Sequence, residues 1–162
     1  MSKIKILLIS LLFAFVVYFW FLVLPKIVSD FSAFEWNNQN EQKVLDCNYF
    51  SAYKNVFVLR VPIGESAFSF GFIGLGNKNN EILTVKHEYG HYLQLKELGW
   101  YKYIRYIAIP SLKGSWGGVS YYDYYSQPWE YGAELYGEVN RVGYKYSSDV
   151  LEEYLKYINK IK

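Results

Sequence analysis

Cysteine is nearly absent from this chain, because Cys47 is the only one among 162 residues. A single thiol excludes an intrachain disulfide, so the cysteine count does not distinguish an oxidising from a reducing compartment. Since free cysteine occurs most often as a small core residue, we expect Cys47 to be buried and chemically inert.

An excess of charge is also missing from most of the sequence. The chain has 17 Lys and Arg residues against 15 Asp and Glu residues, and Lys3 and Lys5 account for the difference. Residues 26–162 are therefore neutral overall. Proteins that bind nucleic acid carry a basic surplus or a basic stripe, so we expect no nucleic-acid partner.

Aromatic side chains, in contrast, are abundant. They make up 21% of the residues, with 18 Tyr, whereas only 20% of the residues are charged. This composition excludes a disordered chain, and 19.1 kDa is enough for one domain with its own core. Tyrosine at this frequency favours a surface that faces lipid headgroups, a substrate or a protein partner.

A long apolar run, residues 4–24, precedes Pro25. At a rise of about 1.5 Å per residue, this run is long enough to cross a bilayer. A cleaved signal peptide would have a shorter apolar stretch and a small-residue cleavage site, and a buried core helix would show a polar face. We therefore predict a single-pass transmembrane anchor over residues 1–25, which contacts the lipid bilayer through residues 4–24.

Flanking lysines set the predicted orientation of this anchor. Lys3 and Lys5 precede the apolar run, while only Lys26 follows it closely. Because basic residues tend to stay on the cytoplasmic side, the rest of the chain is predicted to lie outside the cytoplasm.

Two strands are expected after the anchor. Residues 26–54 mix polar and aromatic types and predict a juxtamembrane connector that becomes helical from Glu41. Residues 55–61 have the β-branched and aromatic content of a strand. Residues 67–76 carry Phe at every second position from 68 to 72, which predicts a second strand with one aromatic face. We expect the two strands to pair as a hairpin or as neighbours.

Helical periodicity is strongest in residues 81–98, and Gly99 follows as a helix stop. Pro128 predicts the start of a helix that runs to about residue 139, and residues 148–161 predict an amphipathic tail helix. Residues 100–112 are apolar and aromatic but contain Lys and Arg, so they fit either a packed helix or an interfacial segment on the bilayer. The predicted fold class is therefore α+β.

The stretch VKHEYGHYLQ, residues 85–94, contains both histidines of the chain. On a helix, His87 and His91 project from one face a turn apart and can bind the same metal ion. Glu88 lies about 100 degrees further round the helix, so its carboxylate can reach a metal-bound water without being a ligand. The alternative is a pair of core histidines with Glu88 on the surface.

A catalytic zinc site needs a third protein ligand and an open position. Because the chain has no further histidine, this ligand has to be acidic or, less favourably, Cys47. An extended HExxHxxGxxH motif would place it at Glu97, but Gln94 stands where that motif needs a chain-turning Gly. The helix is therefore expected to continue and to turn Glu97 away from the metal.

Better candidates for the third ligand lie in QPWEYGAELYGE, residues 127–138. Glu130, Glu134 and Glu138 recur at every fourth position, and carboxylates on one helix face repel one another unless a cation or a proton donor faces them. Metal-bound histidines would meet that need, with Glu130 as the ligand and Glu134 accepting the free N–H of a ligating histidine. The alternative is a solvated acidic face.

HEYGH, followed at a distance by Glu130 and then by an acidic residue four positions on, resembles the motif pair of the glutamate-ligand zincins, the HExxH metallopeptidases with a thermolysin-like HExxH and ExxxD arrangement. The order of FSFGF, HEYGHYLQ, an aromatic linker with IPS, and a closing WE helix is similar to that of small uncharacterised bacterial membrane-associated zincin-like proteins. The resemblance covers roughly residues 66–140. It departs at Glu134, where the family has Asp.

This resemblance implies a small zincin-like metallopeptidase domain over residues 55–162, in which a short β-sheet packs on the HExxH helix beside further helices. It implies a Zn²⁺ ion bound by His87, His91 and Glu130, with Glu88 as the general base that activates a water for peptide-bond hydrolysis. The expected partner is a peptide or protein substrate.

The resemblance also suggests where that substrate binds. The FSFGF strand, with Phe70, Gly71 and Phe72, would be the edge along which an extended peptide pairs. Because the chain has no other histidine, a tyrosine among residues 121–125 would have to stabilise the oxyanion, and the sequence does not select one.

Two other interpretations compete with a peptidase. A membrane-anchored binding or assembly protein with a structural or vestigial metal would close its site with a fourth side chain, such as Cys47 or Asp123. An intramembrane protease would need further spans, and Lys78, Lys86 and Lys96 make the motif helix unfit for hydrocarbon.

Overall fold

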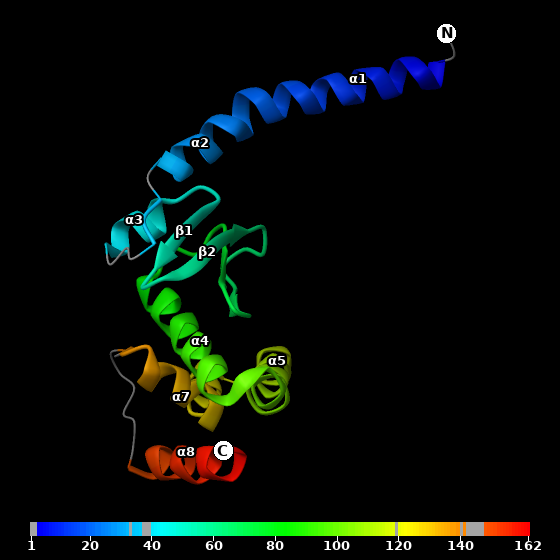
Figure 1. Cartoon of the computed structure of the whole chain (residues 1–162). Coiled ribbons are helices and arrows are strands. Elements are labelled where there is room, and N and C mark those ends of the chain that lie inside the picture. The colour runs from blue at the N-terminus through cyan, green and yellow to red at the C-terminus, as the bar shows by residue number, and fades with distance from the viewer. Residues whose placement is uncertain (1–2, 33, 37–39, 119, 140, 142–147) are drawn as a thin grey trace.

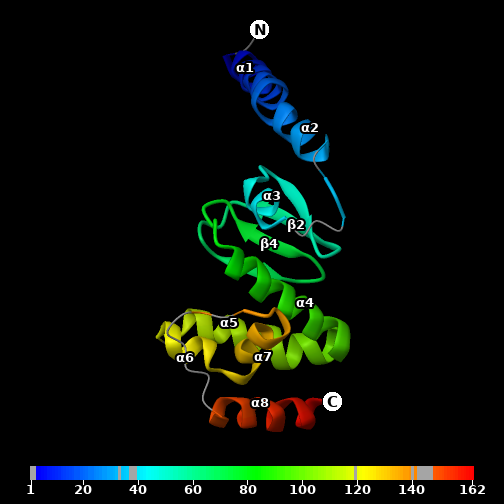
Figure 2. The ribbon, with the colours of Figure 1, turned by 90° about the vertical axis from the view of Figure 1, so that its left-hand side faces the viewer.

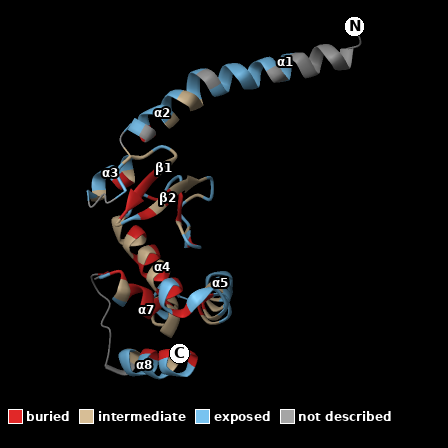
Figure 3. Ribbon diagram, in the orientation of Figure 1, coloured by how far each residue is buried: buried red, intermediate tan, exposed pale blue. Residues whose placement is uncertain are grey.

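A long N-terminal helix, a four-stranded sheet and a group of helices follow one another along the chain (Figure 1, Figure 2). The computed structural model describes residues 3–32, 34–36, 40–118, 120–139, 141 and 148–162. Buried residues gather in the sheet and along α4 (Ile82–Tyr103) and α7 (Pro128–Tyr136), as Figure 3 shows. The predicted α+β class is confirmed.

The N-terminal helix consists of α1 (Lys3–Tyr18), a π-helical turn η1 (Phe19–Val23) and α2 (Leu24–Ser32). Its stretch Phe13–Asp30 is long and apolar enough to cross a membrane. The helix continues past Pro25 although proline has no backbone N–H to donate. The π-helical turn just before it changes the local hydrogen-bond pattern, which accommodates the missing donor.

The sheet has the strand order β1-β2-β4-β3. Its strands are β1 (Phe50–Tyr53), β2 (Val56–Val61), β3 (Ala67–Ser69) and β4 (Ile73–Gly76). β1 pairs with β2 and β3 with β4 in antiparallel fashion, whereas β2 and β4 are parallel neighbours. The strand predicted at residues 55–61 is confirmed, and its pairing with the next segment is side by side and parallel, which excludes a hairpin between them.

The segment before β2 contributes more to this layer than its sequence indicated. Helix α3 (Glu41–Asp46) starts where we predicted, with the Asn40 side chain accepting two backbone N–H groups at its N-terminus. Val44 of this helix is fully buried against the sheet, and β1 is an edge strand. Residues 41–53, which the sequence placed in a connector, are therefore part of the sheet layer.

The prediction of one strand over residues 67–76 is wrong in its middle. Gly71 has a φ of 77°, and the Phe70 N–H donates to the Phe72 carbonyl at 2.9 Å, so the chain reverses there and β3 folds back on β4. The alternating phenylalanines fit this turn: Phe68 packs edge-on against Phe72, and Phe70 against Trp100. An alternating aromatic pattern thus arose from turn packing.

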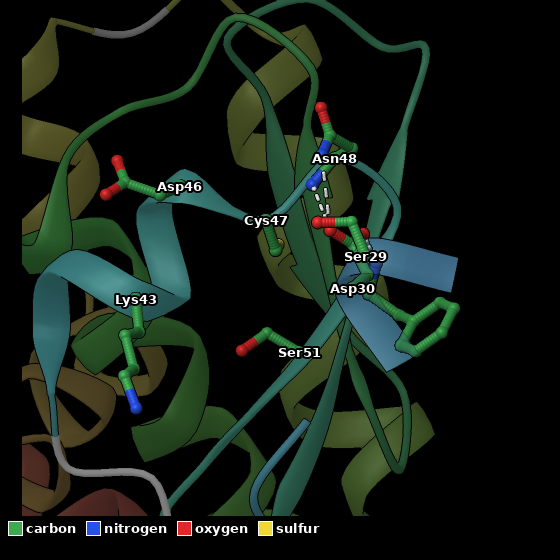
Figure 4. A pocket seen from close by; sticks show the side chains of 8 residues that line it. Ser29, Asp30, Lys43, Asp46, Cys47, Asn48 and Ser51 are labelled. Atoms are coloured by element: carbon green, nitrogen blue, oxygen red, sulfur yellow. Dashed lines mark hydrogen bonds between the residues drawn. The ribbon is translucent and has the colours of Figure 1, made fainter. Parts of the chain in front are cut away.

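Asp30 joins the N-terminal helix to the sheet. Its buried carboxylate accepts the backbone N–H groups of Asn48, Tyr49 and Phe50 at 3.0, 2.5 and 3.1 Å, and also the Asn48 side-chain amide. Figure 4 shows this carboxylate in a hollow between α2 and the start of β1. Because three backbone donors hold one side chain, α2 and β1 are fixed to each other.

α4 is the central helix, and it packs against both parts of the core. Val85 lies with the strand residues Val58, Ile73 and Leu75, while further along the helix Leu98 lies in a second cluster with residues of α7 and the C-terminal helix. The predicted helix over residues 81–98 is confirmed. Gly99, with a φ of 73°, breaks the helix as predicted, but helical structure resumes and continues to Tyr103.

A π-helical turn η2 (Ile104–Ala108) and α5 (Ile109–Trp116) follow α4. Tyr103 and Ile107 are buried in the second core cluster, so residues 100–112 form a packed helical segment on one side. The opposite side is exposed, with Tyr101 71% exposed. The prediction of a packed helix is thus confirmed, and the alternative of a segment that lies on the bilayer is not excluded.

Three helices complete the described chain: α6 (Tyr121–Tyr125), α7 and α8 (Ser148–Ile161). α8 confirms the predicted tail helix, and its buried residues Tyr154, Ile158 and Ile161 close the second core cluster. The helix predicted from Pro128 begins there and ends at Tyr136, three residues short of the predicted end.

Candidate metal centre

The site lies where α4 and α7 approach each other most closely. A Cβ on Gly90 would lie 1.9 Å from the Ala133 carbonyl oxygen, and one on Gly132 would lie 2.6 Å from the Gln94 side-chain nitrogen. Only glycine allows the two backbones to come this near. Since Gly90 lies just before His91 and Gly132 lies between Glu130 and Glu134, this approach brings the motif side chains together.

His87, His91 and Glu130 converge on one point. Glu130 Oε2 lies 3.0 Å from His87 Nε2 and 3.1 Å from His91 Nε2, and the three atoms that could bind a metal are all within 4.8 Å of one another. The side chains are buried, with Glu130 fully enclosed. Two imidazoles and one carboxylate, taken from helices far apart in the sequence, form a group that can hold a metal ion.

Glu134 lies behind His87, as the sequence predicted. Its Oε1 is 2.5 Å from His87 Nδ1, so the carboxylate accepts the N–H on the side of the ring away from the convergent point. Arg141 Nε in turn donates to both oxygens of Glu134 at 3.2 and 3.1 Å. The carboxylate thus sets the ring orientation of His87 and is itself held by a buried cation.

Gln94 performs the same task for His91. Its amide nitrogen donates to the Trp129 carbonyl at 3.0 Å, which leaves its oxygen 2.8 Å from His91 Nδ1. In the neutral ring the proton therefore sits on Nδ1, and the lone pair on Nε2 points at Glu130 Oε2. Two lone pairs face each other unless a proton or a cation lies between them.

The charges of this cluster depend on one another. Burial opposes the charged form of His87, but hydrogen bonds to Glu130 and Glu134 raise its pKa to about 10. Burial would raise the pKa of Glu130, yet attraction to His91 and hydrogen bonds from both rings hold that pKa well below its usual range. In the metal-free protein, His87 is therefore protonated and Glu130 ionised at neutral pH.

Glu88 is buried beside the cluster, contrary to the alternative in which it lies on the surface. Burial raises its pKa, and attraction to His91 and His87 offsets only part of that rise. Among the described residues, Glu88 Oε2 has no hydrogen-bond partner, and the same is true of Glu130 Oε1. Because buried polar atoms normally have a partner, these two carboxylate oxygens are free to bind a water, an ion or a substrate.

Two tyrosines of α6 also reach the site. Burial, followed by the negative charge of Glu130, raises the pKa of Tyr124, whose hydroxyl also interacts with the Glu130 carboxylate and lies 2.9 Å from Ser111 Oγ. The Tyr125 ring packs edge-on against His87 at 5.2 Å and beneath the Arg141 guanidinium. Tyr124 is therefore a candidate for the tyrosine that the sequence did not select.

Several candidates from the sequence lie elsewhere. Glu138 follows the end of α7 with a φ of 55°, is exposed, and faces Lys54, so the prediction of three glutamates on one helix face is wrong at its third member. Glu97 points away as predicted, bonded to Tyr136 and Lys162.

The proposed closing ligands are also remote from the cluster. Cys47, expected to be buried, is only partly so; it lines the hollow near Asp30 (Figure 4), where burial raises the pKa of its thiol. Asp123 is exposed and accepts a hydrogen bond from Ser120 at the start of α6. The residues predicted to bind substrate, Phe70, Gly71 and Phe72, lie in the β3–β4 turn, where Phe70 and Gly71 contact Trp100 and Phe72 contacts Phe68.

Sequence reasoning missed Gln94 and Arg141. Gln94 could have been found, because it lies three residues after His91 on the same helix and so shares its face. Arg141 had no such signal, because it lies beyond the end of α7, where no helical periodicity relates it to Glu134.

The donor set limits the metals that fit. Two imidazole nitrogens and a carboxylate suit Zn²⁺ and other divalent first-row metals, and the donor atoms alone do not choose among them.

Comparison of the chain with family models, characterised proteins and solved structures finds no match.

Proposed function

We propose that the chain is a membrane-anchored zinc-dependent metallopeptidase of the glutamate-ligand zincin type, and that it hydrolyses a peptide bond in a peptide or protein substrate. The observation that carries the proposal is the position of Glu88. Its carboxylate is buried beside three convergent donor atoms and retains an oxygen without a partner among the residues described. A structural metal site needs no such free base.

The residues present fit a bound Zn²⁺ ion. His87, His91 and Glu130 would hold it, because the lone pair on His91 Nε2 and the charge on Glu130 face each other and the second Glu130 oxygen has no partner in the described chain. When bound, such an ion polarises the scissile carbonyl and lowers the pKa of a coordinated water to about 7. With only three protein ligands, a bound ion would keep a place for that water.

The chain's own groups divide the remaining tasks. Glu88, with a pKa raised by burial, accepts the proton of the attacking water and passes it to the leaving amine. Glu134 and Gln94 keep the two imidazole rings turned towards the ion. The Tyr124 hydroxyl lies beside Glu130 and donates to the oxyanion.

The substrate would pair with the sheet. β3 is an edge strand, and it packs beside α4. An extended peptide added to this edge would pass along the motif helix, with the aromatic turn at Phe70–Phe72 at one end. The strand is three residues long, so we expect main-chain pairing over a short stretch and a broad side-chain preference.

The N-terminal helix supports the anchor in this proposal. Its large apolar side chains that the structure describes between Phe13 and Phe21 are exposed, which is costly in water and favourable in lipid. Lys3 and Lys5, which precede the apolar run, favour an amino terminus in the cytoplasm and a site on the other side of the membrane.

A metal analysis of the full chain in detergent tests the site. Wild type and Glu97→Ala, which removes a carboxylate that faces Lys162, are expected to bind one Zn²⁺ ion per chain. Glu130→Ala is expected to lose more than about tenfold in zinc affinity, because even the loss of a residue that only orients a ligand costs about 10–100-fold. Equal zinc binding by wild type and Glu130→Ala would exclude Glu130 as a ligand. Zinc-loaded wild type without peptidase activity would favour the binding or assembly protein.

A further inference from the structure

The helical segment after Gly99 has apolar side chains on two opposite sides. One side packs into the core through Tyr103 and Ile107. The other side, here called the α5 face, exposes Trp100, Tyr101, Ile104, Ile109, Leu112 and Trp116. A helix that is apolar all round is normally buried on all sides, so the α5 face indicates a neighbour other than water.

The charge of this segment indicates which neighbour. Lys102, Arg105 and Lys113 lie in or beside it, and the sequence contains no acidic residue between Glu97 and Asp123. Tryptophan and tyrosine mixed with basic residues are typical of the headgroup level of a bilayer. A locally cationic surface of this kind also attracts anionic lipids.

The arrangement of the helices gives the orientation. In Figure 1, α1 leaves the sheet towards the side of the molecule on which α5 lies, and α5 is seen end-on. In Figure 2, turned by 90°, α5 is seen along its length, so it runs crosswise to α1. A bilayer crossed by α1 would therefore lie roughly parallel to α5, and Figure 3 shows the exposed side of α5 turned away from α4 and α7.

The connection between α2 and the sheet preserves this orientation. The Asp30 carboxylate binds three consecutive backbone N–H groups at the start of β1, so the domain does not swing on a loose linker. The α5 face is joined to the same sheet, because Trp100 packs on Phe70 at 4.8 Å and approaches Gly71 closely.

We propose that the α5 face docks on the surface of the bilayer that α1 crosses, with its aromatic side chains at headgroup level and Arg105 and Lys113 on lipid phosphates. This inference rests on the membrane anchor of the proposed function and is independent of the metal chemistry. The domain would then be attached to the membrane at two points, through the transmembrane helix α1 and through the interfacial helix α5.

Spin labels on the full chain in vesicles test the docking. In a Cys47→Ser background, single labels are placed at Trp116→Cys or Leu112→Cys on the α5 face, at Phe15→Cys in the apolar helix, and at Leu155→Cys as a control. Leu155 is an exposed apolar residue of α8, and α8 lies at the end of the molecule remote from α1 (Figure 1). Vesicles contain phosphatidylcholine and phosphatidylglycerol, and collisions with oxygen and with a water-soluble nickel chelate are measured.

Docking predicts an oxygen-to-nickel accessibility ratio several-fold higher at 116 and 112 than at 155, with the highest ratio at 15. If 116 and 112 are as open to nickel as 155 while 15 is shielded, docking is overturned and the anchor stands. If 15 is also open to nickel, the anchor itself fails. Label–label broadening at 116 that disappears on dilution with unlabelled chain would assign the α5 face to a second copy and overturn lipid docking.

Discussion

At the scale of single residues, the sequence indicated which side chains could hold a metal better than it indicated which residues orient those side chains. The spacing of His87, Glu88 and His91 is a local property of one helix, so the shared direction of the two histidines and the offset of Glu88 followed from helix geometry. Gln94 shares the helix face of His91 and could have been found from its spacing. Arg141 holds Glu134 from beyond the end of α7, and nothing in its local sequence marks that task. The convergence of Glu130 with the histidines was a hypothesis until the fold placed α7 on α4.

The role of Glu88 can be tested by a nearly isosteric change. Glu88→Gln keeps the size of the side chain but cannot accept a proton, so peptide hydrolysis should fall by about a hundredfold or more while bound zinc remains at wild-type level. Zinc content and cleavage of a fluorogenic peptide library are measured on the same preparations. Glu153→Gln, an exposed change on α8, is the matched control. Zinc lost together with activity would make Glu88 a ligand, and unchanged activity would rule it out as the base.

The coupled charges of His87 and Glu130 predict how the metal-free protein responds to pH. The pKa of Glu130 is lowered from 4.5, so its stabilising contribution is lost as pH falls below that value; the pKa of His87 is raised from 6.5 to about 10, so its contribution is complete below pH 6.5 and is lost as pH rises towards 10. Chelator-treated chain in detergent should therefore melt highest between pH 4.5 and 6.5.

Thermal unfolding followed by circular dichroism across this range measures the effect. His87→Gln removes the group that titrates, so its melting temperature should lack most of the fall between pH 6.5 and 10. A wild-type melting temperature that stays constant over that interval would show that His87 is not held in its charged form.

At the scale of elements, long periodic segments were predictable and short ones were not. α4 and α8 repeat their apolar positions over several turns, and both were found within a few residues of their bounds. β1 has four residues in a stretch rich in polar side chains, so its pairing with β2 carries no local signal. The turn at Gly71 was misread because a strand and a packed aromatic turn both place phenylalanine at alternate positions.

The contact between α4 and α7 gives a prediction at this scale. Gly90→Ala would place a methyl group 1.9 Å from the Ala133 carbonyl oxygen, so α7 has to move, at a cost of about 1–3 kcal/mol or more. We expect a lower melting temperature and weaker zinc binding, because Glu130 moves with α7. Gly114→Ala in α5 is the control, since its Cβ would meet the Tyr124 ring at an ordinary 3.4 Å. Wild-type stability and zinc affinity in Gly90→Ala would show that the approach of the helices does not determine the site.

At the scale of the whole molecule, the sequence predicted the parts of the fold but not their mutual placement. The apolar run, the α+β class and the motif helix could be inferred from composition and periodicity. The side of the domain from which α1 leaves, and the lateral position of α5 relative to it, depend on long-range packing and on the Asp30 contact. No local pattern encodes such an arrangement, because it results from loops and interfaces far apart in the chain.

Asp30 has a further consequence for an anchored enzyme. Its side chain accepts hydrogen bonds from the first residues of β1. In the proposed anchored peptidase, the N-terminal helix and the sheet would therefore turn as one body, and the candidate metal centre would keep a constant height above the lipid. The distance of a peptide bond from the membrane would then determine whether it is cleaved, before any side chain is recognised.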